Sequence, residues 1–148
     1  MTKIFFSAIL VLTLFSCGHS QSTSDKEKQR LNIVCDNFMK LFVENKAKEA
    51  LELLKKNTVL TNSSIDTLLV TITQQKENVF SQFGTMLSSE YIKEKTVKDF
   101  IAKRFYIIKF TKFFLKVDFT LYNNGSGWTI TSFHYNEDVD ELLDYRLN

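Results

Sequence analysis

The chain is poor in the residues that bind metals and form disulfides. Its 148 residues include two cysteines, two histidines and four glycines. Apart from Cys17, the soft metal ligands are His19, Cys35 and His134, and no two of them have the spacing of zinc ligands. The sequence also contains no glycine-rich phosphate loop, no nucleophile elbow and no paired carboxylates at a useful spacing. We therefore expect no metal and no cofactor.

The chain also lacks a strong excess of charge and an apolar run long enough to cross a membrane. Its formal net charge is +2 at pH 7, and residues of both signs are interspersed. Proteins that bind nucleic acid usually carry a strongly basic face, so we expect no nucleic-acid partner. The apolar run over residues 4–15 is shorter than the about 20 residues that a membrane-spanning helix needs.

The first sixteen residues instead have the layout of an export signal. A charged start at Lys3 precedes the apolar run, and the small residue Ser16 closes it, as in a signal peptide that is removed. An uncleaved N-terminal helix is the alternative. Either reading places the rest of the chain outside the cytoplasm.

The end of this segment resembles the lipobox of bacterial lipoproteins, in which a leucine lies three places before an invariant cysteine and a small residue directly precedes it. Leu14, Ser16 and Cys17 match these places, while Phe15 is bulkier than the usual residue. The resemblance implies cleavage after Ser16, a diacylglyceryl thioether on Cys17 and usually a third acyl chain. Several acyl chains hold a protein durably on a bilayer. The alternative is an ordinary secretory signal in which Cys17 is incidental.

The resemblance also suggests which membrane holds the protein and how the chain is divided. No aspartate stands directly after Cys17, which favours an outer membrane if the organism has one. Residues 17–25 are polar and predict a flexible lipidated tether, and residues 26–148 have the length of one domain. With Cys17 lipidated, Cys35 has no cysteine left to pair with; it lies among apolar residues and is expected to be a small buried hydrophobe.

The first part of the domain has a helical pattern. Apolar residues recur every three or four positions in three segments. Ser63 or Ser64 suits the N-cap of the third helix, and Gly84 lies where a helix often ends. The expected helices cover residues 26–44, 47–54 and 63–83.

After Gly84 the apolar period changes to two, which is typical of strands. The clearest alternation places Phe113, Leu115, Val117, Phe119 and Leu121 on one face. Residues 123–127, Asn-Asn-Gly-Ser-Gly, predict a tight hairpin turn. The expected strands cover residues 86–97, 103–110, 112–122 and 128–135, with a short helix over 137–147.

Helices followed by antiparallel strands predict an α+β domain in which the helices cover one face of a curved sheet. The element order and the segment Gly127–Phe133 resemble the nuclear transport factor 2-like superfamily, particularly its small lipoprotein members of unassigned function. The resemblance implies a cone whose interior binds a small molecule or is filled by side chains. A cystatin-like wrap with one principal helix is the alternative, and three helical stripes weigh against it.

Enzymes of that superfamily place an aspartate or histidine inside the cone as a general base. Asp118 is expected on the opposite face beside Lys116, either solvated or facing an interface. A regular last strand would point His134 inward with Trp128, and one β-bulge would reverse this. We assign no catalytic residue. The possible pocket residues are Tyr106, Trp128 and His134.

The outer face of the predicted sheet carries aromatic residues. Phe114 and Tyr122, joined by Tyr106 if it points the same way, predict a contact surface. Members of the superfamily commonly dimerise through this face, which implies a homodimer or an envelope protein as partner. The acidic residues near the C-terminus lack the pattern of a calcium loop and predict a solvated helix face. They are Glu137, Asp138, Asp140, Glu141 and Asp144.

Three functions follow from these features. The first hypothesis is a lipid-anchored binding or scaffold domain of the cell envelope without enzymatic activity, which self-associates through its sheet. The alternative is an enzyme of the isomerase or dehydratase type that uses the cone interior. A third hypothesis makes the cone a receptor for an apolar small molecule.

Overall fold

The computed structural model describes residues 23–143. The predicted signal peptide, the lipid attachment at Cys17 and residues 17–22 of the tether lie outside the described residues. Thr23–Asp25, which the sequence assigned to the tether, instead form the first turn of a helix. No helix in the described part is both long and apolar enough to span a membrane.

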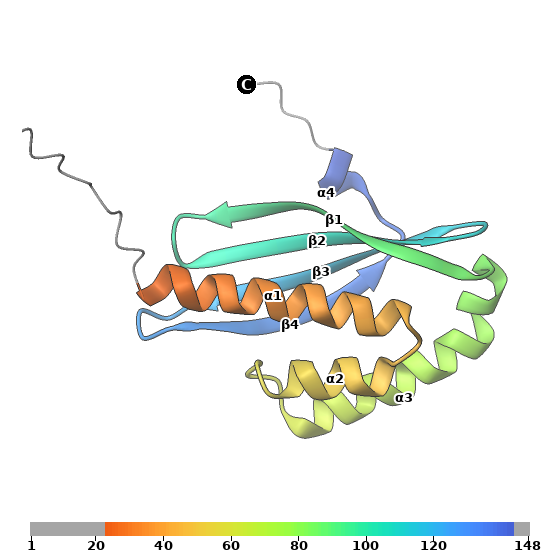
Figure 1. The fold of residues 1–148 in the computed structure, drawn as a ribbon, viewed down its shortest axis with the longest axis horizontal. Helices are drawn as coiled ribbons and strands as arrows, with labels where there is room; N and C mark the ends of the chain where they lie inside the picture. Colours follow the sequence, from red (N-terminus) through yellow and green to blue (C-terminus); the bar gives the residue numbers. More distant parts are fainter. Residues whose placement is uncertain (1–22, 144–148) are drawn as a thin grey trace, which may run out of the picture.

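Three α-helices precede the sheet, as the apolar periodicity predicts (Figure 1). They are α1 (Thr23–Val43), α2 (Ala47–Lys55) and α3 (Asn62–Asn78), followed by the short 3-10 helix η1 (Phe80–Phe83). The N-cap of α3 is Thr61, whose hydroxyl oxygen accepts the Ser64 N–H at 3.1 Å. The prediction of Ser63 or Ser64 as the cap was therefore wrong by two or three residues.

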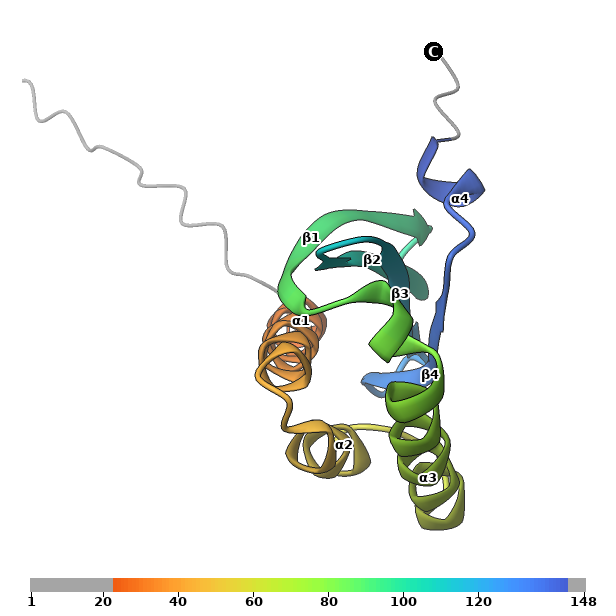
Figure 2. The same ribbon diagram turned by 90° about the vertical axis from the view of Figure 1, so that its right-hand side faces the viewer.

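Four antiparallel strands follow in the order β1-β2-β3-β4. They form one curved sheet that does not close into a barrel (Figure 2). The bounds are β1 (Met86–Val97), β2 (Ile101–Phe110), β3 (Phe114–Asn123) and β4 (Trp128–Asn136). The α+β class and the curved antiparallel sheet are confirmed.

The main core lies between the helices and one face of the sheet. Phe38 of α1 is at its centre and contacts rings from two strands: its ring centroid is 5.2 Å from that of Phe119 and 4.9 Å from that of Phe133. Cys35 is fully buried nearby, as predicted. Burial raises the pKa of its thiol to about 12.

The last strand contains a bulge that changes which residues face this core. Thr120 pairs with Ser132 and Leu121 pairs with Ile130, so Thr131 has no partner on β3. One extra residue reverses the alternation that follows it. Ile130 before the bulge and Phe133 after it are therefore both in the core.

The opposite face of the sheet, where the sequence predicts a contact surface and a solvated or interface-facing Asp118, buries several of its side chains within the domain. The short helix α4 (Asp140–Leu143) lies on the side of the sheet away from α2 and α3 (Figure 1). Lys116 and Asp118 are only 3% and 2% exposed. Phe105 and Leu142 are also buried, and neither belongs to the main core cluster.

Candidate functional site

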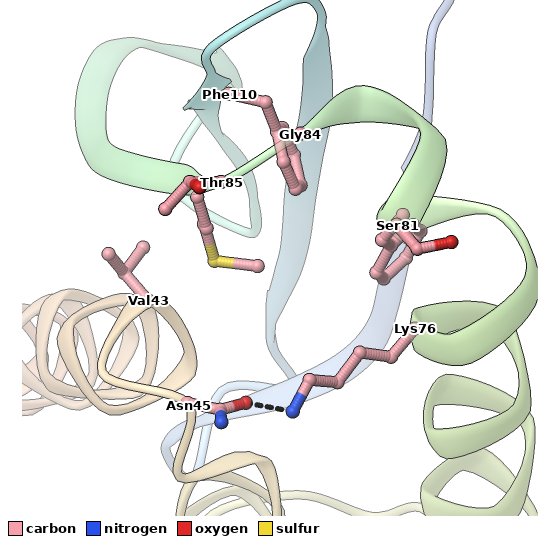
Figure 3. Close-up of a pocket in the computed structure, with 9 residues that line it drawn as sticks. Val43, Asn45, Lys76, Ser81, Gly84, Thr85 and Phe110 are labelled. Carbon is pink, nitrogen blue, oxygen red and sulfur yellow. Dashed lines mark hydrogen bonds between the residues drawn. The ribbon is translucent and has the colours of Figure 1, made fainter.

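A cavity of about 400 Å³ opens at one end of the domain, where the C-terminal end of α1 faces α3, η1 and the start of β1 (Figure 3). This is the mouth of the space between the helices and the sheet, and we call it the mouth cavity. Its lining combines apolar side chains with a few polar ones. The lining residues are Val43, Asn45, Lys76, Phe80, Ser81, Gly84, Thr85, Met86 and Phe110.

Aromatic rings close the inner side of the mouth cavity. The centroid of the Phe80 ring is 6.1 Å from that of Phe110 and 6.0 Å from that of Tyr135. Behind Phe80, the space between Phe38, Phe133 and the neighbouring side chains is too small for a water molecule. The cavity is therefore a shallow site with an aromatic floor rather than the entrance to an open cone.

The rim of the mouth cavity carries one charged side chain. Lys76, in the last turn of α3, donates a hydrogen bond to the side-chain oxygen of Asn45 in the turn after α1 (Figure 3). None of the lining residues is a carboxylate or a histidine. The cavity therefore offers apolar contact at its floor and a single cation at its edge, and it offers no general base.

A second cleft, of about 550 Å³, lies along the edge strand β4, between Leu68 and Gln75 of α3 on the inner side and the outer-face residues near α4, and we call it the outer cleft. Unlike the mouth cavity, it brings together charged side chains from β2, β3 and α4, with the imidazole of His134 from β4. Lys103 donates hydrogen bonds of 3.2 and 3.0 Å to the two carboxylate oxygens of Glu141. The hydrogen bond with Lys103 lowers the pKa of Glu141. Burial lowers the pKa of Lys103, but Glu141 and Asp118 raise it by more.

His134, one of the three predicted pocket residues, lines the outer cleft and not the cone. The bulge at Thr131 turns it to the outer face, where its side chain is 66% exposed. Its Nδ1 atom lies 3.6 Å from Oδ2 of Asp118. The regular strand that would point His134 inward therefore does not form. The strand has the β-bulge that was given as the alternative.

Tyr106, another predicted pocket residue, is packed into the main core at 2% exposure. It pairs with Val117 across β2 and β3, so it shares the inner face and not the outer one. The condition under which Tyr106 would join Phe114 and Tyr122 is not met, because the unbroken β2–β3 register turns it to the inner face. Burial and the hydrogen bond to Asp36 raise the pKa of its hydroxyl.

Trp128, the third predicted pocket residue, joins the β3–β4 hairpin to the start of α1. Its indole N–H donates to the hydroxyl of Ser24 at 2.9 Å. The Nζ atom of Lys28 lies 5.4 Å from the centre of the indole ring. Trp128 therefore holds two elements together and lines neither of the two cavities.

The predicted interface residues do not form one patch. Phe114 lies at the start of β3 and is half-buried, while Tyr122 lies near its end and is 41% exposed. Between them on the same face are the buried Lys116 and Asp118. At the Phe114 end, Phe113 is 41% exposed and stacks on both Phe83 and Phe114, at centroid distances of 4.6 and 5.2 Å.

Sequence reasoning missed the residues that shape both cavities. Phe80 and Gly84 were assigned to a helix stripe and a helix end, and Lys76 carried no signal of its own. Lys116 and Asp118 were named, but their burial was not predicted. Within residues 23–143, no group of three or more histidine, cysteine or acidic side chains could hold a metal ion. Comparisons with protein-family models, curated proteins and solved structures find no match to the chain.

Proposed function

We propose that this chain is a lipid-anchored binding domain of the bacterial cell envelope, with a nuclear transport factor 2-like fold. In this proposal the export signal and Cys17 attach the protein to a membrane, the outer one if the organism has two. The domain binds an apolar small molecule with an acidic head group at the mouth cavity and carries out no reaction on it.

The aromatic floor of the mouth cavity is the observation that carries this proposal. A cavity of about 400 Å³ is within the size range of small-molecule sites, which are mostly apolar with a few placed polar groups. Phe80 and Phe110 supply the apolar surface, and Lys76 supplies a cation where an acidic head group would reach the solvent.

The position of the mouth cavity also suits a tethered receptor. α1 has 21 residues and is therefore roughly 30 Å long. In the sequence the predicted tether precedes α1, and the mouth cavity is lined by Val43 at the C-terminal end of this helix (Figure 3). A ligand bound there is held at the end of the domain that is remote from the tether.

The packing of the interior weighs against the isomerase or dehydratase alternative. A general base must reach the proton that it removes and usually has its pKa tuned by burial. The groups that face the interior behind Phe80 are aromatic and aliphatic side chains, together with the hydroxyl of Tyr135, which donates to Gln75 at 2.6 Å. This packing supports ligand binding at the mouth cavity and weighs against a catalysed reaction in the interior.

Titration of the protein with a dansylated fatty acid tests the proposal. The protein used begins at Gly18, so that it lacks the lipidated Cys17 and contains the whole folded domain. We expect saturable binding, seen as an increase in dansyl fluorescence. Thr85→Trp should block it, because Thr85 is an exposed residue on the rim. Ser126→Trp, in the exposed β3–β4 turn, is the matched control and should bind normally. Equal binding by both variants would refute the mouth cavity as the site.

The head group can be tested separately. The corresponding fatty amide should bind more weakly than the acid to the native chain, because it cannot form an ion pair with Lys76. Lys76→Met should remove this preference and leave the amide affinity unchanged. A preference for the acid that survives Lys76→Met would show that another group recognises the head.

Self-association is the second candidate, and it is favoured by the exposed Phe113, which stacks on the half-buried Phe83 and Phe114. In such a dimer the two copies would contact each other at one end of the sheet. The middle of the sheet is occupied by the charged residues Lys116 and Asp118. Sedimentation of the native chain should show a dimer, and Phe113→Asp should yield a monomer. Tyr122→Asp, at the other end of β3, is the control.

A further inference from the structure

The outer cleft contains a buried carboxylate oxygen without a hydrogen-bond donor. Asp118 is 2% exposed, and its Oδ2 atom has no hydrogen-bond partner. Two side-chain nitrogen atoms face this oxygen, Lys103 Nζ and His134 Nδ1, and both are 3.6 Å from it, which is longer than a hydrogen bond. A buried ionised carboxylate without donors is costly, so this group is poised to accept a hydrogen bond.

The same face carries a buried cation that is only loosely paired. Lys116 is 3% exposed, and among the described residues its one ion-pair partner is Glu141, with 3.7 Å between Nζ and the carboxylate oxygen. Buried lysines are normally paired at hydrogen-bond distance. Lys116 is therefore a donor that lacks a close acceptor.

The two groups are placed to act on one small molecule. Lys116 and Asp118 are two residues apart on the same face of β3, so their backbones are roughly 7 Å apart. Both line the outer cleft, which has about 550 Å³ of space. No ion pair joins them to each other in the described structure.

Neighbouring side chains do not satisfy these two groups. Lys103 donates to both oxygens of Glu141 and has one N–H left for Asp118, but its Nζ stays 3.6 Å from Oδ2. Glu141 is held by Lys103 and lies 3.0 Å from its Nζ, closer than the 3.7 Å to Lys116. The cleft therefore contains an acceptor that lacks a donor and a donor that lacks an acceptor.

We propose that the outer cleft binds a free amino acid or a similar small zwitterion, with its ammonium group on Asp118 and its carboxylate on Lys116. A simple cation would leave Lys116 without an acceptor, and a simple anion would leave Asp118 without a donor. His134, exposed at the edge of the cleft, contacts the ligand from the side of Asp118. This site is separate from the mouth cavity and does not depend on the function proposed for it.

Calorimetric titration of the full chain in lipid nanodiscs tests this inference, with glycine as the probe. Methylammonium and acetate carry the two halves of glycine and serve as separate ligands. We expect saturable binding of glycine and at least tenfold weaker binding of either half. Asp118→Asn and Lys116→Met should each weaken glycine binding at least tenfold, because each removes one charged contact and preserves the size of the side chain.

Lys109→Met is the matched control, because Lys109 is an exposed lysine of β2 that pairs with Glu90 away from the cleft. It should bind glycine as the native chain does. Binding of acetate as tight as that of glycine, or glycine binding that Asp118→Asn leaves unchanged, would overturn the proposal. An absence of glycine binding by the native chain would overturn it as well, and would mean that water alone satisfies Asp118.

Discussion

The hydroxyl of Tyr106 on β2 donates a 2.6 Å hydrogen bond to the carboxylate of Asp36 on α1. Arg104 donates to the same Tyr106 oxygen at 3.1 Å and to the same Asp36 oxygen at 3.3 Å. It also pairs with Glu94 of β1 at 3.0 Å, and its guanidinium lies 4.4 Å from the centre of the Tyr91 ring. This network satisfies a buried arginine and joins α1 to the first two strands.

Removing the Tyr106 hydroxyl should weaken this connection. Tyr106→Phe keeps the ring in the core but leaves Asp36 and Arg104 with one partner fewer. Hydrogen bonds to charged groups contribute about 1.5–3 kcal/mol, so we expect a loss in that range in the free energy of unfolding from urea titration. Tyr122→Phe, which removes an exposed hydroxyl from β3, is the control. Equal losses in both variants would contradict the role given to Tyr106.

Alkaline pH should destabilise the fold through two buried acids. Burial raises the pKa of Cys35 from 9.0 to about 12 and also raises the pKa of Tyr106 above its ordinary 10.0. The unfolded chain therefore loses these protons at a lower pH than the folded one does. Stability is fully present below about pH 9 and falls as pH rises, by up to about 1.4 kcal/mol per pH unit for each group.

Urea titrations between pH 8 and pH 11 measure this slope. Cys35→Ala and Tyr106→Phe should each flatten it, because each variant removes one of the two groups. A slope that neither variant changes would assign the alkaline loss to other residues.

Gly84 should tolerate substitution less well than Gly125, although both have a positive φ. Gly84 has φ +85°, and an added Cβ would lie 2.0 Å from the Thr111 hydroxyl oxygen. Gly125 has φ +91° in the β3–β4 turn, and nothing lies within 4 Å of an added Cβ. Gly125→Ala should cost about 1 kcal/mol from backbone strain alone. Gly84→Ala should lower the melting temperature further, and equal shifts would show that Thr111 moves aside freely.

The helices and the inner face of the sheet could be predicted from the sequence because their apolar periods are regular. The stripe through Phe38 and the alternation through Phe119 both point to the core that forms. Local periodicity determines which face of an element is apolar, and one buried face is enough to fix the register of a strand.

The candidate site could not be predicted in the same way, because it depends on contacts between distant segments. The bulge at Thr131 reverses His134, and nothing in the composition of β4 marks it. Asp118 was correctly placed on the outer face but expected to be solvated or to face an interface, whereas it is 2% exposed within the domain itself. Glu141 was read as part of a solvated acidic face, and its bond to Lys103 is a tertiary contact between residues 38 positions apart.

Removing the hydroxyl group of Ser24 should loosen the start of α1. It accepts hydrogen bonds from the Trp128 indole at 2.9 Å and from the Asn123 side chain at 3.1 Å. These bonds fasten the β3–β4 hairpin to the helix turn that follows the tether. Ser24→Ala leaves both donors without this acceptor, so we expect a loss of about 1 kcal/mol in the free energy of unfolding.

Trp128 is the only tryptophan of the chain, so its fluorescence reports on this contact directly. In Ser24→Ala the first turn of α1 should loosen and the indole should become more hydrated, which moves the emission maximum to longer wavelength. Ser126→Ala changes an exposed serine of the same hairpin, whose hydroxyl bonds only within the turn, and it should leave the emission maximum in place. An unchanged emission maximum in Ser24→Ala, with native stability, would mean that the remaining contacts hold the helix start in place: the Lys28 ammonium over the indole ring and the Glu27 carboxylate that accepts the Trp128 backbone N–H.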